Sequence, residues 1–309
     1  MKYMKLGTSG IRASVVGLGC ARMSQVSVEQ AREVISAALD AGINIFDHAD
    51  AYGFGISEKV FADAFGQLSV PRDRVVLQSK VTIRELDTPK QYYDHDKNYI
   101  LQSVNESLQR LNTEYLDLLL LHRPDALTKP EEVAEAFETL RASGKVRYFG
   151  VSNYNRFQME LLQKYLPEKL IVDQVQFNPA HTFMLDAGFC ANMNNDQAVM
   201  RDGGIIEYCR MEQITMQTYS PFQYGLLEGV FVGSEKYPKL NEKLQELAEK
   251  YHVDVDAIVI AWILRHPAGM QPFPGSMKAH RIQKAAQGAE ITLEPYEWYE
   301  VYKASHYLP

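Results

Sequence analysis

Residues 116–125 read LDLLLLHRPD, a short apolar run that stops at a histidine and an arginine. A run of this length and character is typical of a strand that is buried on both faces. Apolar residues recur at helical spacing on either side of it, at Leu101, Val104, Leu108 and Leu111 and then at Val133, Phe137 and Leu140. The stretch therefore predicts a strand between two amphipathic helices.

The same alternation continues along the whole chain. Gly42 and Gly144 each follow a helical segment, and glycine readily adopts the left-handed conformation that ends a helix before a strand. The eight expected strands, each short and mainly apolar, are Val15–Leu18, Ile43–Phe46, Val75–Ser79, Leu116–Leu121, Val146–Val151, Ile171–Gln176, Ile214–Thr218 and Met270–Phe273.

Eight strand–helix units of one composition predict an α/β fold, a (β/α)8 TIM barrel, as a single domain over residues 1–309. An open doubly wound sheet is the alternative, but it usually carries GxGxxG after its first strand. Residues 17–22 read GLGCAR and lack the third glycine. A turn signal within residues 2–12 predicts an N-terminal β-hairpin that closes the barrel floor. The long connections Asn178–Gly204 and Pro221–Pro238 are expected to be functional covers or locally disordered.

The composition restricts the classes of partner. The chain has 309 residues, 46% of them hydrophobic, and a formal net charge of −7. An acidic surface argues against nucleic acid or an anionic membrane as a partner, so any phosphorylated ligand needs a local basic site. Three cysteines without a CxxC pair predict neither a disulfide framework nor a zinc site. The start has no signal-peptide character and no apolar run is long enough for a bilayer, so a cytoplasmic location is expected.

In a parallel barrel, the active site lies at the carboxyl ends of the strands. Polar residues stand at seven consecutive strand ends of this chain. They are Asp47, His48, Asp50 and Tyr52; Lys80; His122 and Arg123; Ser152 and Asn153; Gln174 and Asn178; Tyr219 and Ser220; and Ser276. Each residue alone is ordinary, and only the aligned series indicates a site.

Seven segments stand in a characteristic order: FDHADAYGFGISE, QSK, LLLLHRPD, GKVRYFGVSN, DQVQFN, TYSPF and FPGSMKAHRI. On these segments the chain resembles the aldo-keto reductase superfamily over nearly its whole length. FDHADAYG and RDGGIIEYCR further resemble a group of bacterial oxidoreductases within it. The resemblance implies a monomeric enzyme that uses NADPH to reduce a small aldehyde or ketone to an alcohol.

The resemblance assigns catalysis to four residues, Asp47, Tyr52, Lys80 and His122. Elementary chemistry agrees, because a carbonyl that accepts hydride also needs a proton, and Tyr52 can give one. Lys80 beside the phenol is expected to lower its pKa, and Asp47 to compensate the buried lysine. His122, as a neutral imidazole, is expected to hydrogen-bond the substrate oxygen.

The resemblance also assigns the cofactor site. Ser152, Asn153 and Gln174 match positions that bind the nicotinamide carboxamide, and Tyr219 matches the aromatic residue that stacks on its ring. Ser220 and Phe222 match the segment that contacts the pyrophosphate. The segment after the last strand supplies Gly275, Ser276, Lys278 and Arg281. Arg281 and Lys278 are expected to bind the 2′-phosphate of NADPH. Two departures from the family pattern weaken the resemblance at the adenosine end of the cofactor site. Gly275 stands where many members have a lysine, and Ala285 stands where many have an asparagine.

Three alternatives remain at this point. Asp47, His48 and His122 could be metal ligands of a barrel hydrolase, but that class needs an HxH pair on the first strand, which here ends in GC. No metal is therefore expected, and His48 is expected to pack or to support the site. A redox-sensing regulatory subunit that binds the cofactor is the second alternative. For each residue, an ordinary packing role is the third.

Met23, Phe54 and residues 178–199 are expected to line an apolar substrate pocket.

Overall fold

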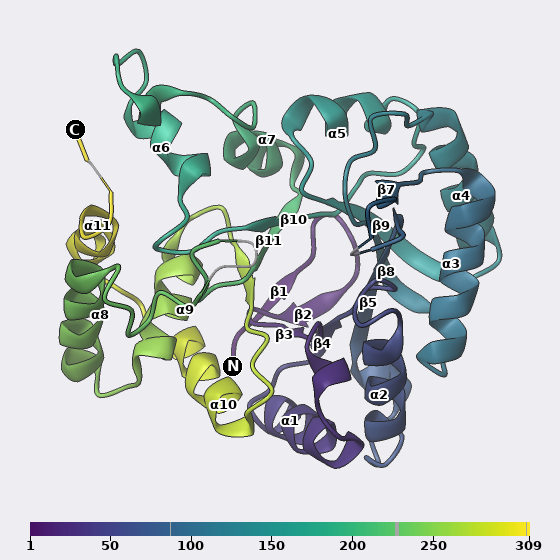
Figure 1. Ribbon diagram of the computed structural model, residues 1–309, viewed down its shortest axis with the longest axis horizontal. Coiled ribbons are helices and arrows are strands. Elements are labelled where there is room, and N and C mark those ends of the chain that lie inside the picture. The colour runs from purple at the N-terminus through teal and green to yellow at the C-terminus, as the bar shows by residue number, and fades with distance from the viewer. Residues whose placement is uncertain (87, 226–228, 307) are drawn as a thin grey trace.

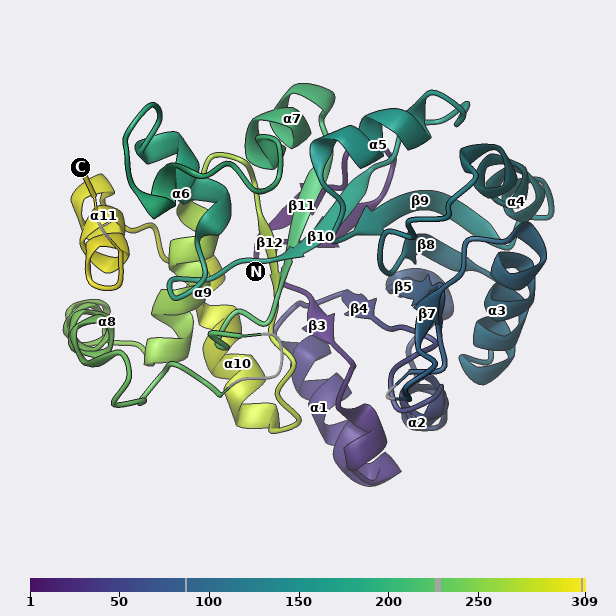
Figure 2. The ribbon, with the colours of Figure 1, turned by 45° about the horizontal axis from the view of Figure 1, so that its top comes forward.

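Eight parallel strands form one closed sheet in the computed structural model, which describes residues 1–86, 88–225, 229–306 and 308–309. In spatial order they are β3 (Leu18–Gly19), β4 (Ile45–Asp47), β5 (Val76–Val81), β8 (Leu116–Leu121), β9 (Val146–Ser152), β10 (Val172–Gln176), β11 (Thr215–Tyr219) and β12 (Gln271–Phe273). The N–H groups of Gly17 and Gly19 each donate to a carbonyl of the β12 segment at 2.9 Å, which joins the two ends of the sheet. Figures 1 and 2 show the strands at the centre and the helices outside. The predicted (β/α)8 TIM barrel is confirmed.

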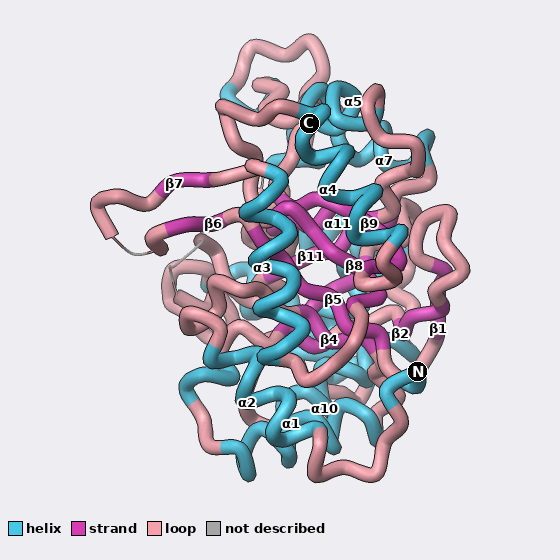
Figure 3. The backbone as a smooth tube through the Cα atoms, turned by 90° about the vertical axis from the view of Figure 1, so that its right-hand side faces the viewer, coloured by secondary structure: helices cyan, strands magenta, loops and turns pink. Residues whose placement is uncertain are grey.

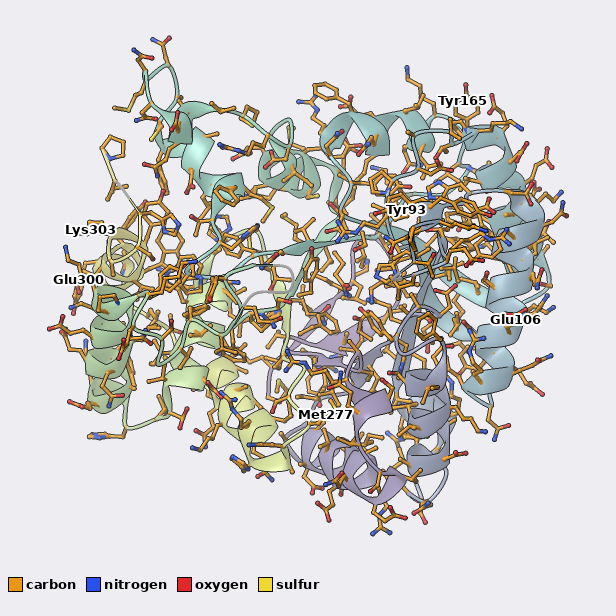
Figure 4. The ribbon with its side chains drawn as sticks, viewed as in Figure 1. Tyr93, Glu106, Tyr165, Met277, Glu300 and Lys303 are labelled. Carbon is orange, nitrogen blue, oxygen red and sulfur yellow. The ribbon has the colours of Figure 1, made fainter. Side chains whose placement is uncertain are left out.

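Eight helices follow the strands: α1 (Val28–Asp40), α2 (Ile56–Phe65), α3 (Lys97–Arg110), α4 (Pro130–Ala142), α5 (Arg156–Gln163), α7 (Ile205–Glu212), α9 (Val255–Arg265) and α10 (Ala279–Gln287). Ser27 and Asn155 begin α1 and α5 through capping boxes, which satisfy free backbone N–H groups. Outside the barrel, α8 (Pro238–Tyr251) packs on α11 (Pro295–Lys303). Lys243 of α8 pairs at 3.3 Å with Glu300 of α11, which is labelled in Figure 4. None of the helices in the described residues is long and apolar enough to cross a membrane.

The predicted hairpin closes the floor of the barrel. It consists of β1 (Tyr3–Lys5) and β2 (Arg12–Ser14), paired antiparallel. Leu6 and Ala13 are fully buried and join an apolar cluster with side chains of the barrel strands, among them Leu118. A second hairpin, β6 (Ile83–Arg84) and β7 (Tyr92–Tyr93), lies on the opposite side of the sheet in Figure 3. The hairpin β1–β2 therefore blocks one end of the barrel, and the strand ends that carry the polar series face the other.

Seven of the eight expected strands have bounds that differ from those observed, most of them by one or two residues at an end. The strand expected at Val15–Leu18 is only β3, because Val15 still hydrogen-bonds to Lys2 of the hairpin segment. The strand expected at Val75–Ser79 continues through Val81, so Lys80 lies within β5. The connection Asn178–Gly204 is not one open loop, because it contains α6 (Phe183–Phe189) and the short helix η3 (Asp196–Ala198).

Two aspartates stand at the second position of their strands and have opposite environments. Asp117 on β8 accepts hydrogen bonds from Arg72, Arg147 and the backbone of Leu77 at 2.8–3.0 Å. Asp173 on β10 is fully buried, and no described group makes a hydrogen bond of ordinary geometry to either of its oxygens. Burial raises the pKa of Asp173 well above its ordinary value, a rise that the nearby backbone of Tyr154 only partly opposes. Burial therefore favours the protonated form of Asp173 over the carboxylate.

We expect the parent protein to lose stability as the pH rises, because Asp173 is buried, and we expect Asp173→Asn to abolish this loss. The unfolded carboxyl ionises near pH 4 but the folded one stays protonated, so the free energy of unfolding falls as pH rises above that value. Each pH unit within this window amounts to about 1.4 kcal/mol. Denaturant unfolding at several pH values should show that the free energy of unfolding of the variant increases relative to that of the parent as the pH increases. Asp117→Asn is the matched control and should destabilise by on the order of 1–3 kcal/mol. Parallel curves for Asp173→Asn and the parent would contradict the assignment.

Candidate active site

A buried lysine at the carboxyl end of β5 organises the site. Side chains of a strand alternate, so Gln78 and Lys80 point into the barrel while Ser79 points outward and donates to Glu58 of α2. The Lys80 Nζ lies 2.7 Å from both carboxylate oxygens of Asp47 and 3.0 Å from the Tyr52 hydroxyl. A fourth contact, at 2.9 Å, reaches the His48 carbonyl. Because lysine can only donate, the Tyr52 oxygen accepts here, and its own proton is left to donate elsewhere.

A tight turn after β4 holds Tyr52 in this position. Three consecutive residues, Gly53, Phe54 and Gly55, have φ values of 57°, 55° and 85°. Glycine adopts such angles without strain, whereas Phe54 does so only because the surrounding structure requires it. A Cβ at Gly53 would lie 2.5 Å from the Ser24 side chain, so the first loop of the barrel packs directly on this turn. Sequence FDHADAYGFG thus encodes a turn that places one phenol above one lysine.

Burial determines the proton affinities of this group. Burial raises the pKa of Tyr52 to about 12, although Lys80 acts in the opposite direction. Lys80 thus lowers the pKa of the phenol as expected, but the loss of hydration has the larger effect and determines the net direction. Burial alone would lower the pKa of Lys80, but Asp47 and Tyr52 raise it above its ordinary value. The structure accordingly holds a charged lysine beneath a protonated phenol.

Two histidines near the site have different surroundings. The His122 ring lies edge-on to Tyr52, with ring centres 5.7 Å apart, and reaches the same pocket. Burial, with Lys80 and Arg123 adding to it, lowers the pKa of His122 well below its ordinary value, so its imidazole is neutral at neutral pH. His48 is fully buried, and no described group hydrogen-bonds its ring nitrogens. It packs against Phe61 with ring centres 4.5 Å apart, and burial lowers its pKa to about 3.

A chain of glutamine amides crosses the barrel beneath the site. Gln78 donates to Asp47 at 2.5 Å and to Gln217 at 2.8 Å, and Gln174 donates to Gln217 at 3.1 Å. Gln217 in turn donates to Gln271 at 3.0 Å, which donates to the carbonyl of Ser14 at 2.7 Å. Four strands are therefore connected through polar side chains in the barrel interior, and Asp47 accepts at one end of this glutamine chain.

A pocket of about 500 Å³ opens above these residues. Most of the predicted site residues line it, namely Asp47, Tyr52, His122, Ser152, Asn153, Gln174, Tyr219, Ser220, Phe222, Gly275, Ser276 and Arg281. Lys80 does not line the pocket; it lies fully buried beneath Tyr52. Lys278 is exposed at the start of α10 and does not line the pocket either. Met277, labelled in Figure 4, marks the turn that separates Lys278 from Ser276.

Hydrogen bonds preorganise the residues expected to bind the nicotinamide. Ser152 Oγ donates to the Gln174 carbonyl at 2.7 Å, and Asn153 Nδ2 donates to Ser152 Oγ at 3.0 Å. The Tyr219 hydroxyl donates to Asn153 Oδ1 at 2.8 Å. Asn153 has a φ of 62°, in the left-handed region that asparagine tolerates. These bonds fix the aromatic ring and the amide on one wall of the pocket.

The other end of the pocket contains an ion pair that sequence analysis missed. Arg281 Nε lies 3.2 Å from Asp256 Oδ2, and the second pair of atoms is 3.4 Å apart. Asp256 lies near the start of α9, where an acidic residue normally indicates only a favourable helix terminus. The ion pair therefore could not be predicted from the sequence, because it depends on the packing of α9 against α10.

The expected pocket lining was wrong in its apolar members. Met23 is fully buried in the core, and Phe54 is 70% exposed; neither lines the pocket, nor does any residue of 178–199. The observed lining instead includes Arg22, Arg123, Gln223 and Val230. Sequence analysis named Arg123 at a strand end but gave it no role, and it did not single out Arg22. Among the described residues, no three His, Cys, Asp or Glu side chains cluster as metal ligands.

Comparisons with known proteins place this geometry in context. A family model described as the aldo/keto reductase family matches residues 15–306. The uncharacterized oxidoreductase YcsN of Bacillus subtilis is 36% identical, and the alignment covers 88% of this chain and 86% of that protein. A 6-dehydroglucose reductase of Novosphingobium aromaticivorans is 31% identical over 98% of this chain and 95% of its own. A crystal structure of an aldo-keto reductase from Klebsiella pneumoniae, in complex with NADPH, aligns with a TM-score of 0.77 at 25% identity, covering 97% and 94% of the two chains.

Proposed function

Because the chain belongs to the aldo/keto reductase family, we propose that it reduces an aldehyde or ketone to the alcohol with a proton from Tyr52. The chain is an NADP-dependent oxidoreductase. The contact that carries the proposal is Lys80 Nζ, which donates to Asp47 and to the Tyr52 hydroxyl at the base of the pocket. This arrangement directs the phenol's proton toward a substrate.

The residues present fit NADPH. The pocket extends from Tyr52 along the amide wall of Asn153 and Gln174 to Arg281 at its far end. Amide and hydroxyl groups suit a carboxamide, and a guanidinium suits a phosphate. NADPH, when bound, supplies the hydride for the carbonyl carbon. Ser152, Asn153 and Gln174 would hold the carboxamide, Tyr219 would support the ring, and Ser276 and Arg281 would hold the phosphate end.

Four side chains of the protein then have separate tasks. Tyr52 gives its proton to the carbonyl oxygen as negative charge develops there. Lys80 stays charged and stabilises the phenolate that this transfer creates, because opposite charges attract strongly where water is excluded. Asp47 holds Lys80 in place and compensates its charge. Neutral His122 can hydrogen-bond the carbonyl oxygen and so orient it over Tyr52.

The proposal is tested with a panel of aliphatic, aromatic and sugar aldehydes, with turnover measured as the consumption of NADPH by absorbance. Saturable turnover of at least one carbonyl, with the alcohol recovered as product, is the expected result. Tight NADPH binding without turnover of any carbonyl would contradict the proposal.

The ion pair at the far end leads to a prediction about cofactor choice. We expect Arg281→Ala to weaken NADPH binding by about 10- to 100-fold and NADH binding far less, because a charge-assisted hydrogen bond to the 2′-phosphate contributes roughly 1.5–3 kcal/mol. Asp256→Asn should act in the opposite direction, since it frees the guanidinium from its carboxylate. Dissociation constants for both cofactors can be measured by fluorescence quenching. Equal constants in the parent protein would show that this segment does not recognise the phosphate.

A further inference from the structure

Two arginines line the pocket in addition to Arg281. Arg123 directly follows His122 at the carboxyl end of β8, and Arg22 lies in the segment after β3. In the barrel, β4 and β5 separate these two strands, so the arginines reach the pocket from different sides. Since β3 adjoins β12 in the closed sheet, Arg22 lies toward the end of the pocket that holds Arg281, whereas Arg123 directly follows His122.

The two arginines differ from the other charged residues of the pocket. Lys80 compensates Asp47, and Asp256 compensates Arg281, at ion-pair distances. Within the described part of the chain, no carboxylate forms an ion pair with Arg22 or Arg123. The protein as a whole carries a formal net charge of −7. Cations without a carboxylate partner, in the pocket of an acidic protein, create a local field that attracts anions.

Arg123 also lies near two residues of the proposed active site, Tyr219 and His122. Burial raises the pKa of Tyr219, and the Arg123 guanidinium opposes this rise, which indicates that the guanidinium lies close to the phenol. The same guanidinium adds to the lowered pKa of His122. Arg123 also directly follows His122 in the chain, and both residues line the pocket.

We propose that Arg123 makes the pocket selective for short carbonyl substrates that carry an oxyanion, a carboxylate or a phosphate, close to the carbonyl. This inference rests on the proposed carbonyl reduction. The planar guanidinium matches both oxyanions with two parallel hydrogen bonds. The bound anion supplies the counter-charge that the pocket lacks, and it positions the carbonyl beside His122 and Tyr52.

The test compares substrates that differ only in charge. Succinic semialdehyde and its methyl ester form one pair, and glyceraldehyde phosphate and glyceraldehyde form the other. We expect the parent protein to show a higher kcat/KM for the charged member of at least one pair, and the two pairs separate a carboxylate preference from a phosphate preference. Added salt should reduce the preference, because salt screens the attraction.

The variants are Arg123→Gln, Arg123→Lys and, as a matched control away from the pocket, Arg32→Gln on the exposed side of α1. Arg123→Gln should lower kcat/KM for the charged substrate by about 10- to 100-fold, mainly through KM, and leave the uncharged partner nearly unchanged. Arg123→Lys should restore part of the loss, because it keeps the charge but not the two parallel bonds. Arg32→Gln should change neither substrate.

The outcomes that would overturn the inference are distinct. Equal kcat/KM for charged and uncharged substrates, or equal losses for both in Arg123→Gln, would show that Arg123 does not select an anion. A rise in the NADPH dissociation constant as large as the loss in kcat/KM would assign Arg123 to the cofactor instead. Failure to reduce any carbonyl while NADPH still binds would overturn the proposed function itself, and this result is different from reduction without charge preference.

Discussion

Tyr52→Phe is expected to lower kcat for carbonyl reduction by about 10²- to 10⁴-fold, the usual contribution of a positioned general acid, while NADPH affinity stays nearly unchanged. The substitution removes one oxygen, which lies 3.0 Å from Lys80 Nζ. The ring can keep its edge contact with His122. With a pKa of about 12, the phenol stays protonated through the neutral range and into the alkaline range, so the parent protein should not lose its acid there.

Steady-state kinetics and cofactor titration of the same preparations measure both effects. Tyr99→Phe is the matched control, because the Tyr99 hydroxyl contacts the Ile83 carbonyl at 3.4 Å and does not line the pocket. This control should keep the parent kcat. If Tyr52→Phe retains more than a small fraction of the parent kcat, the proton comes from another group.

Replacing His122 is expected to have the second largest effect. His122→Ala should lower kcat/KM by about 10²- to 10³-fold, the range measured for loss of one hydrogen-bond donor to a developing oxyanion, and it should also change the order of preferred substrates. Burial keeps the pKa of His122 well below its ordinary value. A profile of kcat/KM against pH should therefore show no fall at about pH 6.5, where an ordinary histidine gains its proton.

His280→Ala, an exposed position on α10, serves as the control and should keep the parent kcat/KM. A role for His122 as a metal ligand predicts the reverse pattern. In that case a chelator would inactivate the parent protein, or an added divalent metal would restore the variant. Either observation would remove His122 from the role of orienting the carbonyl.

Sequence predicted the fold well because each barrel strand is short, apolar and followed by a helix with its own pattern. LDLLLLHRPD became β8 with its predicted bounds, and its polar end reached the pocket. The shortest strand, β3, was the least predictable, because Val15 hydrogen-bonds to the hairpin segment before the barrel begins. Apolar character alone does not distinguish these two environments.

Sequence predicted parts of the site for a related reason. Residues at strand ends converge whatever the intervening helices do, so Asp47, Tyr52 and His122 were named without coordinates. Asp256 was not, because it meets Arg281 only through helix packing. The direction of the pKa shift of Tyr52 could not be predicted from the sequence either, since it depends on how much water the surrounding atoms exclude. Proximity can be read from a pattern of strand ends, but hydration cannot.

The glutamine chain has a consequence for how the phenol recovers its proton after each turnover. Every link has an amide N–H as donor and a carbonyl or carboxylate as acceptor, running from Gln174 through Gln217 and Gln271 to Ser14, and from Gln78 to Asp47. Side-chain amides do not titrate at ordinary pH, so this chain cannot relay a proton as hydroxyls, imidazoles or waters can. The glutamine chain therefore does not conduct protons, and we expect Tyr52 to regain its proton from the mouth of the pocket that it lines. Reprotonation and substrate exchange then share one entrance.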